Sequence, residues 1–210
     1  LEAGTGDINF DGAVGNTNAL GAVAINSVAT LDTDGVFKAA SFTQSAGSVA
    51  TQFDGAVTLT GNFDFTGQAL TVNAAGNNIG GTMDVSNAGL FTTADAADLT
   101  VTGQFTQDGL GTSSLGGNLT GTAGIDFATG ILLTGDDAVV LTTGGAAGQD
   151  IVLGTDNTTD ITGTSQALTL NAGAAGDITI EGDVGGSSAA LGAIIVSNAD
   201  QVRFDETVTA

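Results

Sequence analysis

The sequence predicts an all-β protein wound as a parallel β-helix (β-solenoid), with about ten coils of roughly 18–24 residues each. Three observations support this fold class: short apolar–polar alternations recur along the chain, segments rich in Gly, Asn and Asp separate them, and longer segments repeat. The 210 residues include no Pro, which is expected if most backbone N–H groups donate to hydrogen-bond ladders. Cys is also absent, so neither disulfides nor thiolate metal sites can hold the fold.

The predicted strands are short and half-buried. Each has two apolar side chains on one face and a polar side chain on the other, the pattern of a strand of about three to five residues. Nine such alternations occur, at 8–10, 57–59, 70–72, 83–85, 99–101, 125–127, 168–170, 178–180 and 202–204. Segments such as 73–78 and 144–148 supply the Gly, Asn and Ala expected in turns.

Internal repeats extend beyond single strands. GDINFDGAVG at 6–15 returns as GDITIEGDVG at 176–185, and each is followed by ALGA, at 19–22 and 190–193. The other repeats are VTLTGNF at 57–63 with LTVTGQF at 99–105, QALTVNAAG at 68–76 with QALTLNAG at 166–173, FDGAV at 10–14 and 53–57, and SNA at 86–88 and 197–199. The VTLTGNF pair starts 42 residues apart, which fits two coils, whereas the QALT pair starts 98 apart and fits poorly. Stacked coils would form a rod on the order of 50 Å long.

A β-sandwich repeat is the alternative fold, because it also predicts short strands and regular turns. A sandwich needs bulky inward side chains between its sheets, whereas aromatic residues are only 5% of this chain and Trp is absent. We therefore expect a thin interior of small apolar side chains. Asn26, Asn73 and Asn171 each follow an apolar strand, and could stack as an amide ladder or simply begin turns.

Charge restricts the partners. The chain carries 23 acidic and two basic residues, Lys38 and Arg203, for a formal net charge of −21. Phosphate binding requires a basic surface, so a nucleic-acid partner is excluded, and binding to anionic lipid is disfavoured for the same reason. No run approaches the roughly 20 apolar residues of a membrane helix, so membrane insertion is not expected.

Catalytic constellations are limited by what the sequence lacks. Without His, Cys or Tyr, neither Ser-His-Asp nor Cys-His catalysis can operate, and His-ligated zinc or iron sites are ruled out. Paired carboxylates of a glycosidase remain conceivable at Asp136 and Asp137, or at Asp95 and Asp98. Solvated turn positions are the simpler interpretation, so we predict a non-enzyme without catalytic, cofactor or metal residues.

Calcium is the one cofactor that the sequence leaves open. Asp32-Thr33-Asp34-Gly35 matches the opening of an oxygen-rich calcium loop but lacks the later acidic ligand. The segment 144–151 is similar to the glycine-rich calcium nonapeptide of secreted β-rolls, with one residue too many and no tandem copy. An Asx turn explains both segments equally well.

The Thr pairs and the two basic residues are the remaining candidate functional residues. The pairs Thr58/Thr60, Thr100/Thr102 and Thr162/Thr164 could align on a flat face and template ordered water, as in ice binding, although outward Thr is common on any exposed strand. Neither cation marks a site on sequence grounds.

The repeats G-D-I-x-[FI]-x-G-x-V-G, followed by A-L-G-A and then by a strand ending in S-N, resemble the filamentous-haemagglutinin-like and related giant repetitive surface proteins of bacteria. The resemblance covers essentially the whole chain as a style of repeat. It implies a right-handed parallel β-helix, secretion, and a role as an adhesin shaft, surface layer or fibre. The family's secretion and adhesive-tip signatures are not visible, so no binding residue is carried over.

Together these features predict that residues 1–210 are a single repetitive β-solenoid, a fragment or repeat unit of a longer extracellular protein or fibre. Neither end of the sequence reads as a cap, so we expect self-association through ends or edges, or contact with neighbouring repeats. The alternative is an adhesin module at the cell surface that binds a glycan or protein on a host or neighbouring cell.

Overall fold

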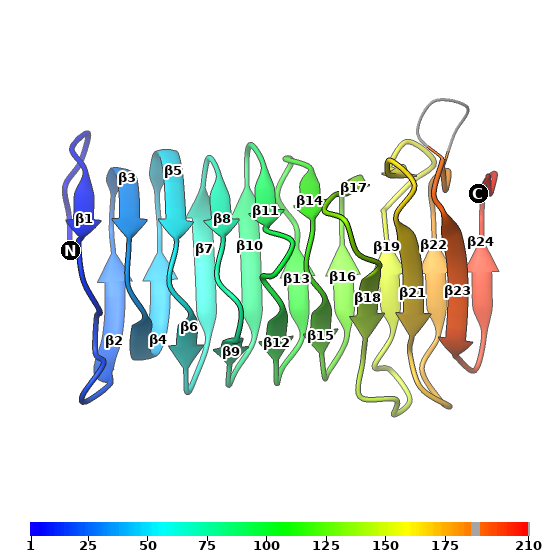
Figure 1. The fold of residues 1–210 in the computed structure, drawn as a ribbon, viewed down its shortest axis with the longest axis horizontal. Coiled ribbons are helices and arrows are strands. Elements are labelled where there is room, and N and C mark those ends of the chain that lie inside the picture. Colours follow the sequence, from blue (N-terminus) through cyan, green and yellow to red (C-terminus); the bar gives the residue numbers. More distant parts are fainter. Residues whose placement is uncertain (186–189, 210) are drawn as a thin grey trace.

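The computed structural model, which describes residues 1–185 and 190–209, is a parallel β-solenoid of about nine coils. Its strands stand side by side along one long axis, with the two termini at opposite ends (Figure 1). Every strand pairing between the described strands is parallel, which confirms the solenoid and excludes the sandwich. Within the described residues there is no helix, and hence none that could cross a membrane.

Most coils have three short strands, so the solenoid has three faces. Face 1 is an eight-stranded sheet, in which each strand pairs with the one a coil earlier and a coil later. Its strands are β1 (Ile8–Phe10), β3 (Val28–Thr33), β5 (Gly47–Phe53), β8 (Leu70–Val72), β11 (Phe91–Thr93), β14 (Ser113–Leu115), β17 (Ile131–Leu133) and β20 (Ile161–Thr162).

Faces 2 and 3 diverge from the long strand β4 (Phe37–Gln44), whose first half pairs with β6 and whose second half pairs with β7. The strand β2 (Leu20–Ile25) pairs along β4 on its other side. Face 2 continues through β6 (Val57–Leu59), β9 (Asn77–Ile79), β12 (Leu99–Val101), β15 (Leu119–Gly121), β18 (Val139–Thr142), β21 (Ala167–Asn171) and β23 (Ala193–Asn198). Face 3 continues through β7 (Phe63–Gly67), β10 (Met83–Asn87), β13 (Phe105–Gln107), β16 (Ile125–Phe127), β19 (Ile151–Leu153), β22 (Ile178–Ile180) and β24 (Val202–Phe204).

Coil length varies more than the sequence predicted. Register partners on face 1 are 18 residues apart between Ser113 and Ile131, but 30 apart between Ile131 and Ile161. The long coil has enlarged loops at 143–150 and 154–160, outside the strands. The predicted range of 18–24 is therefore wrong for this coil, because corner loops can lengthen without disturbing the strand register.

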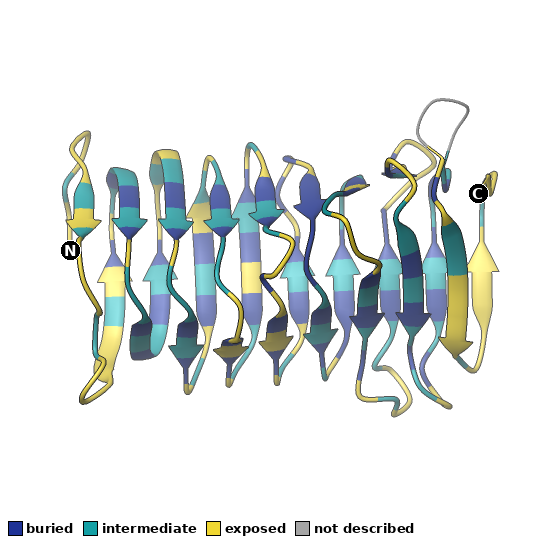
Figure 2. Cartoon of the chain, viewed as in Figure 1, coloured by how far each residue is buried: buried dark blue, intermediate teal, exposed yellow. Residues whose placement is uncertain are grey.

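The interior is continuous along the axis (Figure 2). Alternate residues of the strands point inward, so most short strands of the middle coils have two buried residues on either side of a more exposed one. The expectation of a thin core of small side chains is wrong for the second and third coils. There Phe37, Phe42, Phe53 and Phe63 are buried and pack with ring centroids 4.9–5.8 Å apart.

Only some of the sequence repeats occupy equivalent positions in successive coils. VTLTGNF and LTVTGQF both begin on face 2 and end on face 3, and FDGAV twice joins face 1 to face 2. The QALT repeats instead lie on face 1 at β8 and on face 2 at β21, which explains their poor fit to the coil length. GDI at 6–8 leads into face 1, whereas GDI at 176–178 leads into face 3.

The amide ladder proposed for Asn26, Asn73 and Asn171 does not form. The three residues follow β2, β8 and lie at the end of β21, so they occupy different corners of the solenoid. Asn171 Oδ1 instead accepts the N–H of Gly173 at 3.1 Å, which is an Asx turn. The turn interpretation is confirmed for this residue.

Candidate functional site

Several Asp and Asn side chains lie at the corners, which are the turns between faces, and contact the next coil. In several coils the residue that leads into a strand is Asp or Asn, and its Oδ1 accepts a main-chain N–H from the following coil. We call these contacts axial caps. They are Asp7 to Thr30, Asn62 to Thr82, Asp98 to Asn118, Asn118 to Val140, Asp150 to Asp177, Asp160 to Asp183, Asp177 to Gln201 and Asp183 to Thr207, at 2.8–3.3 Å. These side chains therefore satisfy N–H groups where one coil passes onto the next.

One corner gathers carboxylates without such a cap. Between face 1 and face 2, Asp34 and Asp54 each follow a face 1 strand and precede a Gly, one coil apart. Asp32 lies on the outer side of β3, paired in register with Gln52. The carboxylate oxygens of Asp32, Asp34 and Asp54 lie within 4.8 Å of one another. Of the described residues, only these three bring metal-ligating side chains together in this way.

The polar surroundings of this acidic corner are uneven. Asp54 Oδ1 accepts hydrogen bonds from Asn73 Nδ2 at 2.6 Å and from Gln52 Nε2 at 2.9 Å. Asp32 Oδ1 is buried and has no hydrogen-bond partner in the structure. Oxygen ligands of this kind suit a hard cation such as Ca²⁺. The sequence pattern singles out Asp32 and Asp34 but not Asp54, although the Asp-Gly of 54–55 repeats the Asp-Gly of 34–35 one coil later.

A calcium titration followed by melting temperature tests this corner. Binding predicts a rise in melting temperature that the Asp54→Asn variant loses, because a ligand that binds the native state and not the unfolded chain stabilises the native state, more so as its concentration exceeds its Kd. An unchanged melting temperature would show that the three residues bind no calcium and serve only as turn and strand residues. The segment 144–151 offers no comparable cluster: Gln149 Oε1 accepts the N–H of Ala146 at 2.8 Å, and Asp150 is used as an axial cap.

A second group of carboxylates lies on the outer side of face 3. Asp64 and Asp84 are register partners in β7 and β10, and Asp126 lies two coils beyond Asp84. Burial raises the pKa of Asp84 above its ordinary value, and the negative charges of Asp64 and Asp108 add to this effect. Burial also raises the pKa of Asp126, again with a contribution from Asp108. Asp84 and Asp126 therefore hold protons more tightly than free Asp.

The carboxylate pairs considered for glycoside hydrolysis are corner residues. Asp95 and Asp136 are brought together across two coils, since Asp95 Oδ1 accepts the N–H of Asp136 at 3.1 Å. Asp98 serves as an axial cap to Asn118. Asp95, Asp136 and Asp137 are all exposed. Their exposed corner positions favour the interpretation of these Asp as turn residues. That the chain is not an enzyme remains a prediction.

The Thr pairs divide between two faces. Thr58/Thr60 and Thr100/Thr102 lie at β6 and β12 of face 2, two coils apart, whereas Thr162 lies in β20 of face 1. On face 2 the outward column runs through Thr58, Asn78, Thr100, Thr120 and Thr142. Because the Thr residues are irregularly spaced in the sequence, Thr120 and Thr142 could not be recognised there as members of this column. Asn78 and Gly80 interrupt the array between the two pairs.

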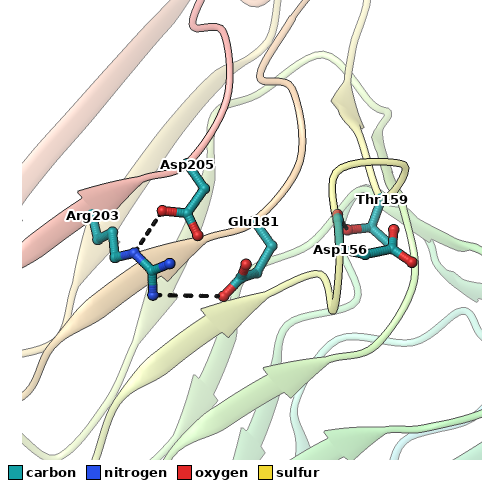
Figure 3. A network of polar contacts seen from close by, with 5 residues as sticks. All are labelled: Asp156, Thr159, Glu181, Arg203 and Asp205. Carbon is teal, nitrogen blue, oxygen red and sulfur yellow. Dashed lines mark hydrogen bonds and ion pairs between the residues drawn. The ribbon is translucent and has the colours of Figure 1, made fainter.

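Arg203 participates in a small charged network near the C-terminal end (Figure 3). Its Nε lies 2.5 Å from Asp205 Oδ1 and its Nη1 lies 4.0 Å from Glu181 Oε1. A hydrogen bond shared with Asp205 raises the pKa of Glu181. The positive charge of Arg203 lowers this pKa and so partly offsets the rise. In the nearby loop, hydrogen bonds from Thr158 lower the pKa of Asp156. Lys38 lies far away, on β4, in register with Thr58.

A shallow groove follows the corner between face 3 and face 1 across four coils. Its lining residues are mostly small and uncharged: Ser45, Ala46, Gly47, Thr66, Gly67, Gln68, Ser86, Asn87, Ala88, Asp108, Gly109 and Leu110. Leu110 is 93% exposed, the most exposed large apolar side chain among the described residues. The groove contains one acidic residue, Asp108, beside the exposed Leu110, a composition suited to contact with another molecule.

Comparison of the chain with known protein families, with curated proteins and with solved structures found no match. No relative therefore assigns a role to any of these residues.

Proposed function

We propose that this chain is a non-enzymatic structural module of an extracellular surface protein or fibre, serving as a shaft, surface layer or filament scaffold. The observation that carries the proposal is the uninterrupted interior. Inward side chains from Leu31 to Ile180 are at most a few per cent exposed along the coils, with no break that would separate two lobes around a cleft.

The polar residues support the same role. Eight corner Asp and Asn side chains form axial caps, so their hydrogen bonds hold neighbouring coils together. The charge of −21 keeps such a rod soluble and discourages adhesion to other acidic surfaces. The proposal includes right-handed winding and a location at the cell surface. Both are implied by the resemblance of the repeats to those of filamentous-haemagglutinin-like proteins.

Two measurements test the proposal. Small-angle scattering of residues 1–210 should give an elongated particle, because about nine coils at ~4.8 Å each form a rod of roughly 43 Å before any association. Limited proteolysis of intact cells should remove the native protein from their surface. A protein that stays protected until the cells are lysed would contradict the extracellular role.

The groove between face 3 and face 1 favours a second candidate, an adhesin module that binds a glycan or protein. Binding of residues 1–210 to a glycan array or to whole cells tests it. Loss of binding in the Leu110→Ser variant, with binding kept in a Leu132→Ser variant on face 1, would support the groove. A shaft without adhesive function should bind nothing.

A further inference from the structure

The groove between face 3 and face 1 is bordered by carboxylates on its face 3 side. Its lining includes the outward residues Thr66 and Ser86, which are register partners in β7 and β10. Asp64 and Asp84 precede them by two residues in the same strands, about 6.6 Å away along each strand. Both carboxylates point outward, because each lies between two buried residues. Asp126, on β16, continues this row two coils beyond Asp84, and we call the three residues the acidic rim.

The face 1 side of the groove is apolar. Val49, Leu90 and Leu110 are 55%, 44% and 93% exposed, and we call them the apolar rim. Each lies two residues after a lining residue of the groove, in the direction of face 1. Their coils have neighbouring coils on both sides, so the exposure of these side chains is a property of the corner itself. Exposed apolar side chains that follow one groove are typical of a surface that contacts a partner.

The turn that carries Leu110 is held from beneath by buried amides. Gln107 is fully buried, and its Nε2 donates to Gly109 O at 3.0 Å and to Gly111 O at 3.1 Å. The same Nε2 donates to Asn87 Oδ1 at 2.7 Å, which ties the turn to the preceding coil. A Cβ at Gly109 would overlap main-chain atoms of Asn87, so the turn lies directly against that coil. Leu110 is therefore presented by a fixed turn, which reduces the entropy lost when it makes a contact.

Negative charge is crowded along the acidic rim. Burial raises the pKa of Asp84 and of Asp126, and the negative charge of Asp108 in the groove adds to the rise in both. The two basic residues of the chain lie elsewhere: Lys38 is on β4 in register with face 2, and Arg203 is on β24, three coils beyond Asp126. A positively charged partner would therefore relieve a repulsion that the chain itself leaves uncompensated.

We propose that this groove binds an extended segment of a partner protein in which basic side chains alternate with apolar ones. Alternate side chains of an extended chain point to opposite sides, so the basic residues face the acidic rim while the apolar residues between them face the apolar rim. The lining covers four coils, and three steps of ~4.8 Å give roughly 14 Å, the length of about five extended residues. This inference rests on the second candidate function proposed above and names the ligand class of the same groove.

The test uses two labelled peptides with blocked ends, and fluorescence anisotropy with residues 1–210 measures the Kd of each. Lys-Leu-Lys-Leu-Lys has the alternation, whereas Lys-Lys-Lys-Leu-Leu has the same composition and charge without it. Asp108→Asn and Leu110→Ser change the groove. Asp137→Asn and Leu132→Ser are their matched controls, since they alter exposed residues of the same kinds at another corner and on the outside of face 1. Far-UV circular dichroism checks folding, and Leu110→Ala replaces Leu110→Ser if the latter unfolds.

The proposal predicts that the alternating peptide binds roughly fivefold more tightly than its control, and that added salt weakens its binding. Leu110→Ser should raise the Kd of the alternating peptide about tenfold, as expected for an anchoring apolar side chain. Asp108→Asn should raise this Kd about two- to fivefold, as expected for an exposed ion pair. The two control variants should bind as tightly as the original chain.

Any one of three results would overturn the proposal: no binding of the alternating peptide, equal binding of both peptides, or equal losses in the groove variants and their controls. The last two would mean that only the net charge attracts the peptide. A glycan that binds through Leu110 when the alternating peptide does not would reject the peptide ligand but keep the adhesin candidate. An elongated, surface-exposed protein that binds neither would reject both and keep the scaffold role.

Discussion

Neighbouring coils contact each other closely at an Asp-Gly corner, and a single methyl group added there tests the stacking. FDGAV occurs twice, with Gly12 in the first coil and Gly55 in the third. A Cβ at Gly55 would lie 2.5 Å from Val36 N and closer still to the carbonyl group of Gly35, one coil earlier. A Cβ at Gly12 would meet nothing within 4 Å, because within residues 1–210 no coil is stacked on that side of it.

The expected energies follow from this difference. Gly55→Ala forces backbone against backbone, an overpacking cost at the upper end of about 1–3 kcal/mol. Restriction of the unfolded chain returns about 0.4–1 kcal/mol, which leaves a net destabilisation of roughly 2 kcal/mol. Gly12→Ala gains the entropic term alone and should be stabilised by about 0.5 kcal/mol. Neither glycine has a positive φ, so backbone strain affects neither variant.

Urea unfolding followed by far-UV circular dichroism measures both variants. The midpoint for Gly55→Ala should fall by roughly 1 M relative to the original chain, given a slope of about 2–3 kcal/mol/M, whereas that for Gly12→Ala should stay level or rise slightly. Equal midpoints for the two variants would refute the reasoning, because the pentapeptides are identical and only the preceding coil distinguishes them.

Three further predictions follow from buried and charged side chains. Ser113→Ala should raise stability by about 1 kcal/mol in urea unfolding, because Ser113 is fully buried and its Oγ lacks a hydrogen-bond partner; a loss of stability would mean that the hydroxyl is bonded. The raised pKa of Asp84 means that the native state binds more protons than the unfolded chain, so its contribution to stability falls as pH rises through that pKa. Asp84→Asn should accordingly raise the melting temperature more at about pH 7 than at about pH 4, and a larger gain at the lower pH would contradict the assignment. Arg203→Ala should leave the melting temperature nearly unchanged, since the Arg203 side chain is 64% exposed; a large drop would show that its ion pairs hold the last coil.

The sequence was sufficient to predict the fold because each strand carries its own pattern. Two inward apolar residues around one outward polar residue define a short strand wherever they occur, as at 70–72 and 125–127, and the glycines mark the corners between them. Parallel stacking could be predicted because some repeats, such as FDGAV, lie one or two coils apart at equivalent positions.

Other features could not be read from single segments. A strand with the same sequence can occupy any of the three faces, so the QALT and GDI repeats gave misleading offsets. Corner loops have no fixed length, and the coil that contains 143–150 and 154–160 is far longer than its neighbours. Assigning faces requires the axial register, which short alternating strands do not specify by themselves.

The candidate site was only partly predictable for the same reason. Asp32 and Asp34 stood out as neighbours in sequence, but Asp54 joins them only because one coil separates 34 from 54. The axial caps were not predicted, since an Asp or Asn that bonds the next coil looks like any other turn residue. The Phe cluster was missed because a low total of aromatic residues says nothing about their concentration in the second and third coils.

A crystal structure of residues 1–210 tests the central claim most directly. Stacked coils predict parallel strands spaced by about 4.8 Å along one axis, in a rod of roughly 43 Å. Compact, rounded molecules without axial strand spacing would contradict the solenoid and every role inferred from it.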